Sequence, residues 1–410
     1  MEQTLQRARV ASSSSISRPV LFLHIPKTGG TSLLLTLRNT FGDNRVRRIH
    51  QVDEHIGETI EQIVEHEFAG ISCLAGHLPL HLFDAMLDRF HPFTVLREPV
   101  ARVLSVYRFI RSGDPLVPAR LGLRPDFSLD DFLNWGHPEV FGQVNNGMVR
   151  MLCGNPRLFD PGNPMIWEIG GQIDTLEQAV ANLERIDFGL AEDMAATQAL
   201  ARACWGVPYN LSEYRENATA PDASGDEVAL IHRVVEMNTA DIALYHRARE
   251  IFHARVPALP DAVLADGWNP LAVFVPEMNR EASIGDIPGR QGFHEFEADG
   301  FAWLHAHQPT VLHFAADRDL VRLRLRVYCV IPTYPAADIA ISINAHKLQV
   351  KVSPADDKWR WVETEHFETR DGLNRLTIKA PLFIPANELE ADCKDSRKLS
   401  IALEHVEIGP

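Results

Sequence analysis

The stretch that decides the fold runs from Pro19 to Leu37 and reads PVLFLHIPKTGGTSLLLTL. An apolar run is followed by a proline, by a polar segment with two glycines, and by a leucine-rich segment of helical character. This order predicts a buried strand, a tight loop and a helix. Gly29 and Gly30 allow the backbone of the loop to turn sharply and to approach a ligand closely.

The loop has the composition of an anion-binding site. Its amides and the N-terminus of the following helix direct positive partial charge toward one point. Lys27 adds a full positive charge, and hydroxyl donors come from Thr28, Thr31 and Ser32. We therefore expect a cradle for a phosphate or sulfate group. The alternative is a strand-to-helix turn that binds nothing.

The nucleotide-binding P-loop, GxxxxGK[ST], has its lysine after the second glycine. Lys27 precedes both glycines, so this pattern fails. The string HIPKTGGTS, from His24 to Ser32, instead resembles the 5′-phosphosulfate loop of sulfotransferases that use 3′-phosphoadenosine 5′-phosphosulfate (PAPS). It is most similar to the heparan sulfate and uronyl 2-O-sulfotransferase group. The resemblance implies that PAPS is the donor and that these residues bind it: Lys27, Thr28, Gly29, Gly30, Thr31 and Ser32.

A second motif, TVLREPVARVLSVYR, covers residues 94–108. It resembles the 3′-phosphate motif of the same sulfotransferases. Arg97, at the end of a predicted strand, has a guanidinium that can clamp a phosphate through two hydrogen bonds. Ser105 lies two helical turns further on and can donate its hydroxyl. The resemblance gives both residues a role in cofactor binding.

The implied reaction is in-line transfer of a sulfuryl group to an acceptor hydroxyl, which has to lose its proton. His77 is the candidate general base, because Gly76-His77 follows a predicted strand and resembles the Gly-His that carries the catalytic base of the 2-O-sulfotransferases. An imidazole titrates near neutral pH, as this role requires. Lys27 is the second catalytic candidate, since it can stabilise charge on the leaving phosphate. His24 is the alternative base, although its place in the loop favours packing against the cofactor.

Further segments resemble the acceptor side of the same group. Residues 107–114 are similar to a segment whose arginine contacts the acceptor sugar, which implies acceptor binding by Arg111, although an exposed, solvated arginine is equally compatible. Residues 145–154 resemble a segment that lines the acceptor side, with Asn145 and Arg150 as substrate-binding candidates. Residues 210–219 fit a loop over the adenine, which implies that Arg215 binds the cofactor.

The composition limits the classes of partner and compartment. The chain has 410 residues and a formal net charge of −15, which argues against a nucleic-acid-binding surface. Five widely spaced cysteines favour a reduced compartment and free thiols, and we expect no metal site. No apolar run reaches membrane-spanning length and no signal peptide is recognised, so the expectation is a cytoplasmic protein of bacterial type. The sequence leaves the oligomeric state open, and a homo-oligomer is allowed.

Four regions follow from changes in pattern along the chain. We predict a disordered lead over 1–18, a PAPS-dependent sulfotransferase domain over 19–256, a linker over 257–292 and a β domain over 293–410. The first domain is predicted as α/β, P-loop-like, with a central parallel sheet flanked by helices. Its predicted strands are 20–25, 70–75, 92–97 and 186–191, and its predicted helices are 31–41, 55–67, 79–90, 99–111, 174–185 and one long helix within 226–255.

The second domain is predicted as an all-β sandwich or jelly roll. Residues 321–327 alternate between apolar and basic side chains, which is typical of a half-buried strand. Residues 339–343 and 348–352 flank the tetrapeptide Asn344–Lys347 and predict a hairpin. The C-terminal pattern resembles small β-sandwiches attached to glycan-modifying enzymes. Trp303, Trp359 and Trp361 are candidates for stacking on sugar rings, although core positions are the commoner use of tryptophan.

Three functions remain open at this level. The first is a PAPS-dependent sulfotransferase that acts on a hydroxyl of a carbohydrate or glycoconjugate. The second keeps the chemistry but has a tyrosyl protein or a small metabolite as acceptor. The third is a non-catalytic glycan-binding protein that carries a degenerate transferase domain. A kinase is disfavoured because no Walker or kinase motif is present.

Overall fold

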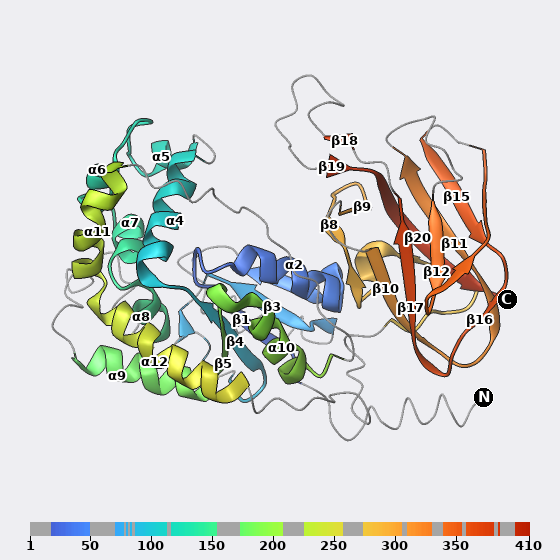
Figure 1. Ribbon diagram of the computed structural model, residues 1–410, viewed down its shortest axis with the longest axis horizontal. Coiled ribbons are helices and arrows are strands. Elements are labelled where there is room, and N and C mark those ends of the chain that lie inside the picture. Colours follow the sequence, from blue (N-terminus) through green and yellow to red (C-terminus); the bar gives the residue numbers. More distant parts are fainter. Residues whose placement is uncertain are drawn as a thin grey trace.

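The structure is a computed structural model, and Figure 1 shows an α/β domain and a β domain side by side. It describes residues 18–49, 70–77, 79–80, 83, 87–112, 116–153, 173–207, 225–256, 274–305, 310–329, 339–354, 358–380, 384–385 and 398–410. Residues 1–17 of the predicted lead (1–18), the helix predicted for 55–67 and the loop with Arg215 lie outside these residues. Within the described part, no helix has the length and apolar character that crossing a membrane requires.

The α/β domain is built on a parallel five-stranded sheet with the order β2-β3-β1-β4-β5. The strands are β1 (Val20–Leu23), β2 (Val46–Ile49), β3 (Cys73–Gly76), β4 (His91–Leu96) and β5 (Asp187–Leu190). The predicted strand at residues 20–25 is therefore the centre of the sheet. The parallel sheet with flanking helices confirms the predicted α/β class.

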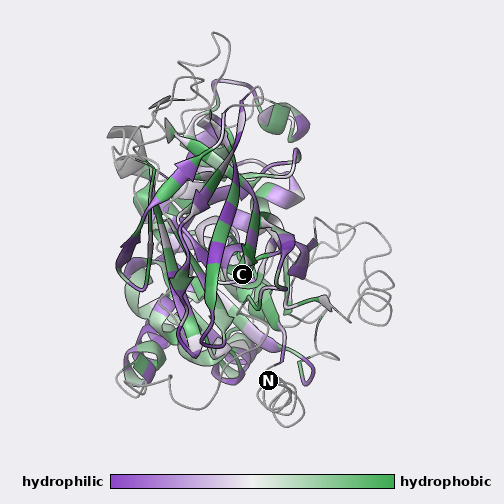
Figure 2. Cartoon of the chain, turned by 90° about the vertical axis from the view of Figure 1, so that its right-hand side faces the viewer, coloured by the Kyte–Doolittle hydropathy of each residue, from purple (hydrophilic) through white to green (hydrophobic). Residues whose placement is uncertain are grey.

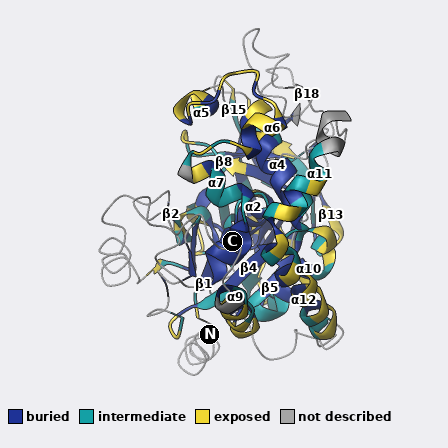
Figure 3. Ribbon diagram, turned by 90° about the vertical axis from the view of Figure 1, so that its left-hand side faces the viewer, coloured by how far each residue is buried: buried dark blue, intermediate teal, exposed yellow. Residues whose placement is uncertain are grey.

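Helices cover both faces of this sheet, and their outer surfaces are exposed (Figure 3). α2 (Gly30–Phe41) and α10 (Met194–Trp205) pack on one face, and α8 (Gly147–Leu152), α9 (Ile173–Arg185) and α12 (Thr239–Arg255) pack on the other. The further helices α4 (Pro99–Ser112), α5 (Leu116–Arg120), α6 (Leu129–Leu133), α7 (Pro138–Val144) and α11 (Gly225–Met237) pack on one another in an apolar cluster of their own. Short 3₁₀ helices are η1 (Asp43–Arg45), η7 (Ala191–Asp193) and η9 (Ile284–Asp286).

The apolar run of β1 is continuous because both of its faces are buried. Val20 and Phe22 belong to a core cluster with α2 and Trp205, whereas Leu21 and Leu23 belong to another cluster with α8, α9 and α12. Alternate side chains of one strand thus point into two separate cores. This places the loop after β1 at the centre of the carboxyl edge of the sheet.

Two helix predictions are corrected by the structure. The long helix predicted within 226–255 is divided into α11 and α12 at Asn238, whose buried amide donates to the carbonyl oxygens of Val144 (2.7 Å) and Val234 (2.8 Å). The same side chain accepts a hydrogen bond from the Asn146 amide at 3.0 Å. A tertiary contact therefore interrupts a helical pattern. In the helix predicted for 79–90, the described residues 87–90 form a turn and a bend.

The second domain consists of two antiparallel sheets that share one hydrophobic core. One sheet has the order β13-β12-β17-β10-β7, and the other contains β14-β15-β11-β20-β9-β8, with β16 paired to β11 and β6 paired to β20. In Figure 2 the strands of this domain alternate between hydrophilic and hydrophobic residues. The observed sheets agree with the all-β prediction; the sandwich or jelly-roll topology stays a prediction.

The strands of the second domain begin earlier in the sequence than we predicted. They are β6 (Arg280–Ser283), β7 (Arg290–Gln291), β8 (Phe293–Phe296), β9 (Ala302–Leu304), β10 (Thr310–Ala316), β11 (Leu320–Cys329), β12 (Ala340–Ile343), β13 (His346–Leu348), β14 (Val350–Val352), β15 (Trp359–Thr364), β16 (Phe367–Glu368), β17 (Gly372–Lys379) and β20 (Ile401–Gly409), with a separate pair β18 (Ile384–Pro385) and β19 (Lys398–Leu399). Because β6 and β7 pair with strands of the two sheets, the predicted linker 257–292 is too long at its C-terminal end.

The hairpin predicted around residues 339–352 is tighter than the sequence indicated. β12 and β13 are joined by the two residues Asn344 and Ala345, both with positive φ (49° and 71°). This is the backbone of a type I′ turn, which fits the twist of paired strands. β14 then leaves this sheet and pairs with β15 in the other one.

Helix α2 connects the two domains. At its C-terminal end the Thr40 carbonyl accepts a hydrogen bond from the Gly289 amide at 2.9 Å. The buried Arg290 donates from Nε to Asn39 Oδ1 at 2.8 Å and also pairs with Asp43. The helix that begins at the predicted anion site therefore ends in a polar interface with the β domain.

A buried ion pair holds the helical layer together beside the sheet. Arg102 of α4 and Asp241 of α12 are both fully buried, with 3.5 Å between Nη2 and Oδ2. Asp241 also accepts hydrogen bonds from the amides of Met148 (3.1 Å) and Val149 (2.8 Å) at the start of α8. Arg102 donates to the Gln143 carbonyl at 2.6 Å. The pair thus joins α4, α8 and α12.

We predict that Asp241→Ala lowers the free energy of unfolding by about 3–5 kcal/mol, because it leaves the Arg102 charge and two amides buried without an acceptor. Urea denaturation of the full chain measures this. The control Asp130→Ala removes an exposed pair with Arg233 (2.7 Å) and is expected to change stability little. Equal effects of the two substitutions would contradict the role of the buried pair.

Candidate active site at the carboxyl edge of the sheet

The loop between β1 and α2 has a constrained backbone that only glycine allows at two positions. Gly29 has φ of 87°, and a Cβ on Gly30 would lie 1.9 Å from Cδ2 of His24. Lys27 also has positive φ (66°), which is uncommon for a side chain of this size. The buried Thr28 hydroxyl donates to the Ile25 carbonyl at 2.9 Å and closes the loop.

The N-terminus of α2 is open to a ligand. Its N-cap residue is Gly29, so no side chain of the cap accepts hydrogen bonds from the first amides of the helix. Thr31 is exposed and Ser32 is buried on the first turn. Amides without an intrahelical acceptor and the helix dipole together favour an anion at this position.

His24 is a packing residue and not a suitable base. Its side chain is 5% exposed and lies between Phe22, at 5.3 Å between ring centroids, and His77, at 4.1 Å. Burial, with smaller contributions from the positive charges of His77, Arg48 and Lys27, lowers the pKa of His24 to about 2. A ring of so low a pKa is a poor proton acceptor at neutral pH.

His77 follows β3 and is oriented by the backbone of the β1 loop. Its Nδ1 lies 2.7 Å from the carbonyl oxygen of His24. A carbonyl oxygen only accepts, so Nδ1 carries the hydrogen and donates it. In the neutral ring this leaves the lone pair on Nε2. The arrangement is that of an imidazole prepared to accept a proton at Nε2.

Arg97 follows β4 and joins the lysine loop directly. Its Nη1 donates to the Lys27 carbonyl at 3.0 Å. The next residue, Glu98, accepts hydrogen bonds from the amides of Val100 (3.1 Å) and Ala101 (2.7 Å) and so caps α4. Burial, with a smaller contribution from the Arg97 charge, lowers the pKa of Lys27. Three adjacent strands, β3, β1 and β4, therefore deliver His77, Lys27 and Arg97 to one place.

Two residues that sequence reasoning did not assign lie beside these groups. Phe109 of α4 has its ring centroid 4.0 Å from Lys27 Nζ and is 47% exposed. Arg48, near the end of β2, is close enough for its charge to lower the pKa of His24. In the sequence, Arg48 belongs to a group of three arginines at positions 45, 47 and 48, which could have signalled it. Nothing in the helical pattern of α4 signals Phe109.

The remaining predicted residues on α4 differ in exposure. Ser105 is 6% exposed, two turns after the start of the helix. Arg111 in the last turn is exposed, donates to the Tyr107 hydroxyl, and has its guanidinium 5.6 Å from the Tyr107 ring centroid. The structure thus places Arg111 at the surface, where either predicted role is compatible with it.

Arg150, a predicted substrate-binding residue, is buried and bonded within the protein. Arg150 is 1% exposed and donates to Asn145, from Nε to the carbonyl at 2.7 Å and from Nη2 to Oδ1 at 3.2 Å. Its guanidinium lies 5.4 Å from the ring centroid of Phe141, and burial lowers its pKa to about 10. The side chain supports the turn between α7 and α8. Asn145, which is half-buried, is part of the same contact.

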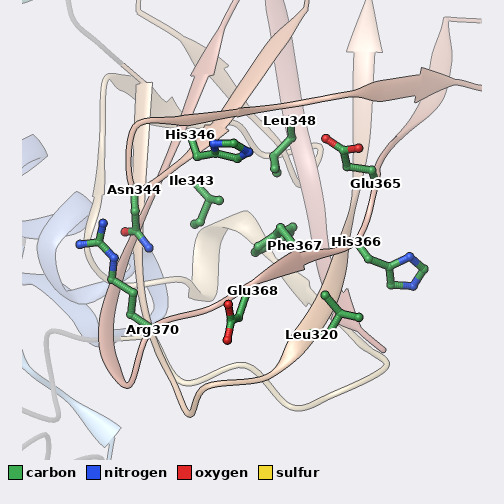
Figure 4. A pocket seen from close by; sticks show the side chains of 10 residues that line it. All are labelled: Leu320, Ile343, Asn344, His346, Leu348, Glu365, His366, Phe367, Glu368 and Arg370. Atoms are coloured by element: carbon green, nitrogen blue, oxygen red, sulfur yellow. The ribbon is translucent and has the colours of Figure 1, made fainter.

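The second domain carries a separate cavity of about 470 Å³. Figure 4 shows polar side chains around an apolar floor at the β12–β13 turn and β16. The lining residues are Leu320, Ile343, Asn344, His346, Leu348, Glu365, His366, Phe367, Glu368 and Arg370. The candidate tryptophans lie elsewhere: Trp303 is in a buried cluster, and Trp359 and Trp361 are half-buried beneath Arg326 and Arg324.

Comparison with known proteins gives distant relatives. No protein-family model matches the chain. It is 25% identical over 280 residues to human heparan-sulfate 6-O-sulfotransferase 2, which covers 58% of this chain and 45% of that protein. It is 27% identical over 189 residues to human heparan-sulfate 6-O-sulfotransferase 1, and this match covers 41% of this chain and 44% of that protein. The chain thus spans less than half the length of these human relatives.

Likeness among solved structures is weak. Mouse sulfotransferase SULT7A1 complexed with PAP is 13% identical, covers 55% of this chain and 67% of that chain, and has a TM-score of 0.28. The module Xyl-CBM35, solved with a glucuronic acid containing disaccharide, is 13% identical, and the match covers 32% of this chain and 92% of that chain with a TM-score of 0.22. Scores this low establish no shared fold.

The motifs resembled the 2-O group, whereas the relatives are named for 6-O transfer. Both agree at the level of carbohydrate sulfotransferases, and to these the chain is distantly similar.

Proposed function

We propose that this protein transfers the sulfuryl group of PAPS to a hydroxyl of a carbohydrate acceptor. The observation that carries the proposal is the meeting of three strand ends, where Arg97 donates to the Lys27 carbonyl and His77 to the His24 carbonyl. The distant similarity to heparan-sulfate 6-O-sulfotransferases supports the reaction class. In a chain of net charge −15, a site with Lys27, Arg97 and Arg48 favours an anionic ligand.

The donor would bind along the β1 loop and α4. The 5′-phosphosulfate would accept hydrogen bonds from the open amides of α2 and from hydroxyls of its first turn. Arg97 would hold the 3′-phosphate, with Ser105 on the following helix as a further donor. The proposed cofactor-binding residues are Lys27, Thr28, Gly29, Gly30, Thr31, Ser32, Arg97, Ser105 and Arg215. No metal is part of this mechanism.

The chemical step is an in-line displacement at sulfur. The acceptor oxygen attacks the sulfur while Nε2 of His77 takes the proton of the acceptor hydroxyl. Nε2 is free to accept this proton because Nδ1 carries the ring hydrogen and donates it to the His24 carbonyl. The bond from sulfur to the bridging phosphate oxygen breaks, and the electron pair goes to the 5′-phosphate. Lys27 and the amides of α2 stabilise the charge that develops there.

The acceptor would approach past α4. Phe109 is a large apolar ring exposed beside the catalytic ammonium, and one side of a sugar ring is a flat surface of C–H groups. Contact between the two would hold the acceptor hydroxyl near Lys27 and His77. Arg111, also on α4, is a candidate for an acidic group of the acceptor, and Asn145 remains a substrate-binding candidate. A tyrosyl or small-metabolite acceptor is the alternative.

A second role is proposed for the cavity of the β domain. Its apolar floor is surrounded by amide, imidazole, carboxylate and guanidinium groups, which together suit a sugar ring with several hydroxyls (Figure 4). We infer that this cavity holds part of a glycan acceptor or of a related polysaccharide.

We predict that 3′-phosphoadenosine 5′-phosphate at a hundred times its dissociation constant stabilises the chain by about 2.7 kcal/mol. His77→Ala should keep this stabilisation and lose turnover by at least about 100-fold. The matched variant Arg97→Ala should raise the dissociation constant by about 10–100-fold, since it removes a charged hydrogen bond to phosphate. Differential scanning fluorimetry and transfer of labelled sulfate measure the two effects. No stabilisation of the wild-type chain would favour the degenerate, non-catalytic alternative.

Phe109→Ala should raise the KM for a carbohydrate acceptor by about 10-fold and leave the dissociation constant of 3′-phosphoadenosine 5′-phosphate unchanged, whereas Phe109→Trp should keep the wild-type KM. Steady-state kinetics at saturating PAPS measures this. Leu116→Ala, which truncates another exposed apolar side chain, is the control. An unchanged acceptor KM in Phe109→Ala excludes the contact.

The variant with both His366→Ala and Arg370→Ala should lose retention on the polysaccharide that retards the wild-type chain in affinity electrophoresis. Arg280→Ala, at an exposed position on β6, serves as the control and should keep retention. Equal retention of the double variant and the control would refute the cavity as a glycan site, and leaves the transferase proposal untouched.

A further inference from the structure

A cluster of three metal-ligating side chains lies at the opposite edge of the parallel sheet. His91 is the first residue of β4, Asp187 is the first residue of β5, and Cys204 is near the end of α10. One ligand atom from each lies within 4.8 Å of the other two. Since β4 is six residues long, about 20 Å of strand separates this cluster from the candidate active site.

We propose that His91, Asp187 and Cys204 form a binding site for a transition-metal ion, with Zn²⁺ as the best match. Thiolate, imidazole and carboxylate are the three side-chain ligand types that Zn²⁺ uses in proteins. No sequence motif signals the site, because its members are 96 and 17 residues apart along the chain. The cysteine spacing alone led to the opposite expectation.

The carboxylate of Asp187 contacts both of the other ligand side chains. Nε2 of His91 lies 2.8 Å from Oδ2 of Asp187. The Cys204 thiol is hydrogen-bonded to the same carboxylate. The three ligand groups therefore already face one another, and an ion could replace the protons that they share.

A neighbouring arginine orients the carboxylate. Arg255 Nη1 lies 3.7 Å from Oδ1 of Asp187, on the other oxygen from the one beside His91. Arg255 is itself held by the carbonyls of Ile186 (2.9 Å) and Glu184 (3.0 Å). Charged groups beside a ligand carboxylate help to fix its orientation in metal sites. The contact leaves Oδ2 for the metal.

The distances require only a small adjustment. Bonds of about 2.0–2.3 Å to a tetrahedral Zn²⁺ place ligand atoms roughly 3.3–3.8 Å apart. The His91 and Asp187 atoms, which are 2.8 Å apart, would separate by about 0.5–1 Å. The Cys204 sulfur, which lies within 4.8 Å of both, would move toward them by up to about 1 Å. The Cys204 thiol is free in the described structure and would release its proton to the solvent when the metal binds. Three protein ligands leave a fourth position for water.

Such a site would cross-link β4, β5 and α10 at the amino edge of the sheet. It does not touch Lys27, His77 or Arg97, so the inference is independent of the proposed transferase function. A metal ion that binds the folded chain and not the unfolded chain would stabilise the folded state.

The test uses the tag-free full chain after treatment with EDTA and dialysis. Titration calorimetry with ZnCl₂ should give one site with a dissociation constant below about 1 μM, and Zn²⁺ should raise the melting temperature. His91→Ala and Cys204→Ser should each weaken this binding by at least about 100-fold. The control Cys153→Ser, at a buried thiol outside the cluster, should bind as the wild-type chain does.

The absorption spectrum of bound Co²⁺ distinguishes a cysteine that binds the metal from one that only supports the fold. Co²⁺ bound to the wild-type chain should show a thiolate-to-cobalt charge-transfer band, and Cys204→Ser should lose it. The absence of Zn²⁺ binding below about 100 μM by the wild-type chain overturns the proposal. So does unchanged binding in a folded Cys204→Ser chain.

Discussion

The hydrogen bond from Arg97 to the carbonyl of Lys27 is the contact on which the candidate site depends. It joins the ends of β4 and β1, and it fixes a lysine whose backbone is already in a left-handed conformation. The parallel register of the two strands brings the two residues together. Leu23 pairs with Thr94, so Arg97, three residues after Thr94, follows β4 beside the loop that follows β1. On the other side of β1, the His24 carbonyl orients His77 in the same way. Two backbone carbonyls of one loop thus position two side chains from neighbouring strands.

Helix α2 begins at this loop and ends at the second domain. Its open N-terminus faces the predicted anion, and its C-terminal residues Asn39 and Thr40 bind Arg290 and Gly289 of the β domain. Arg290 is buried, and burial lowers its pKa to about 9. A buried guanidinium needs such partners, because an unpaired charge in this place is costly. The β domain is therefore joined to the C-terminal end of α2 by buried polar contacts.

The two edges of the parallel sheet carry different chemistry for a common reason. In a parallel sheet, all strands begin at one edge and end at the other, so residues at equivalent strand positions gather whatever their distance in sequence. The carboxyl edge collects Lys27, His77 and Arg97. The amino edge collects His91 and Asp187, which α10 completes with Cys204. One topology thus creates both candidate sites, and only the first is accompanied by a local sequence motif.

The sequence by itself determined those features of the protein that depend on residues close together in the chain. The apolar run, the glycines and the leucines from Pro19 to Leu37 predicted strand, loop and helix, because a strand buried on both faces and a tight turn each impose a local composition. The ends of β3 and β4 were likewise readable, which brought His77 and Arg97 into the prediction. Tertiary structure decided the rest. It buried Arg150 against Asn145, interrupted the last helices at Asn238, exposed Phe109 beside Lys27 and assembled His91, Asp187 and Cys204. These features come from contacts between distant segments, and side-chain burial and long-range hydrogen bonds leave no periodic signal in the local sequence.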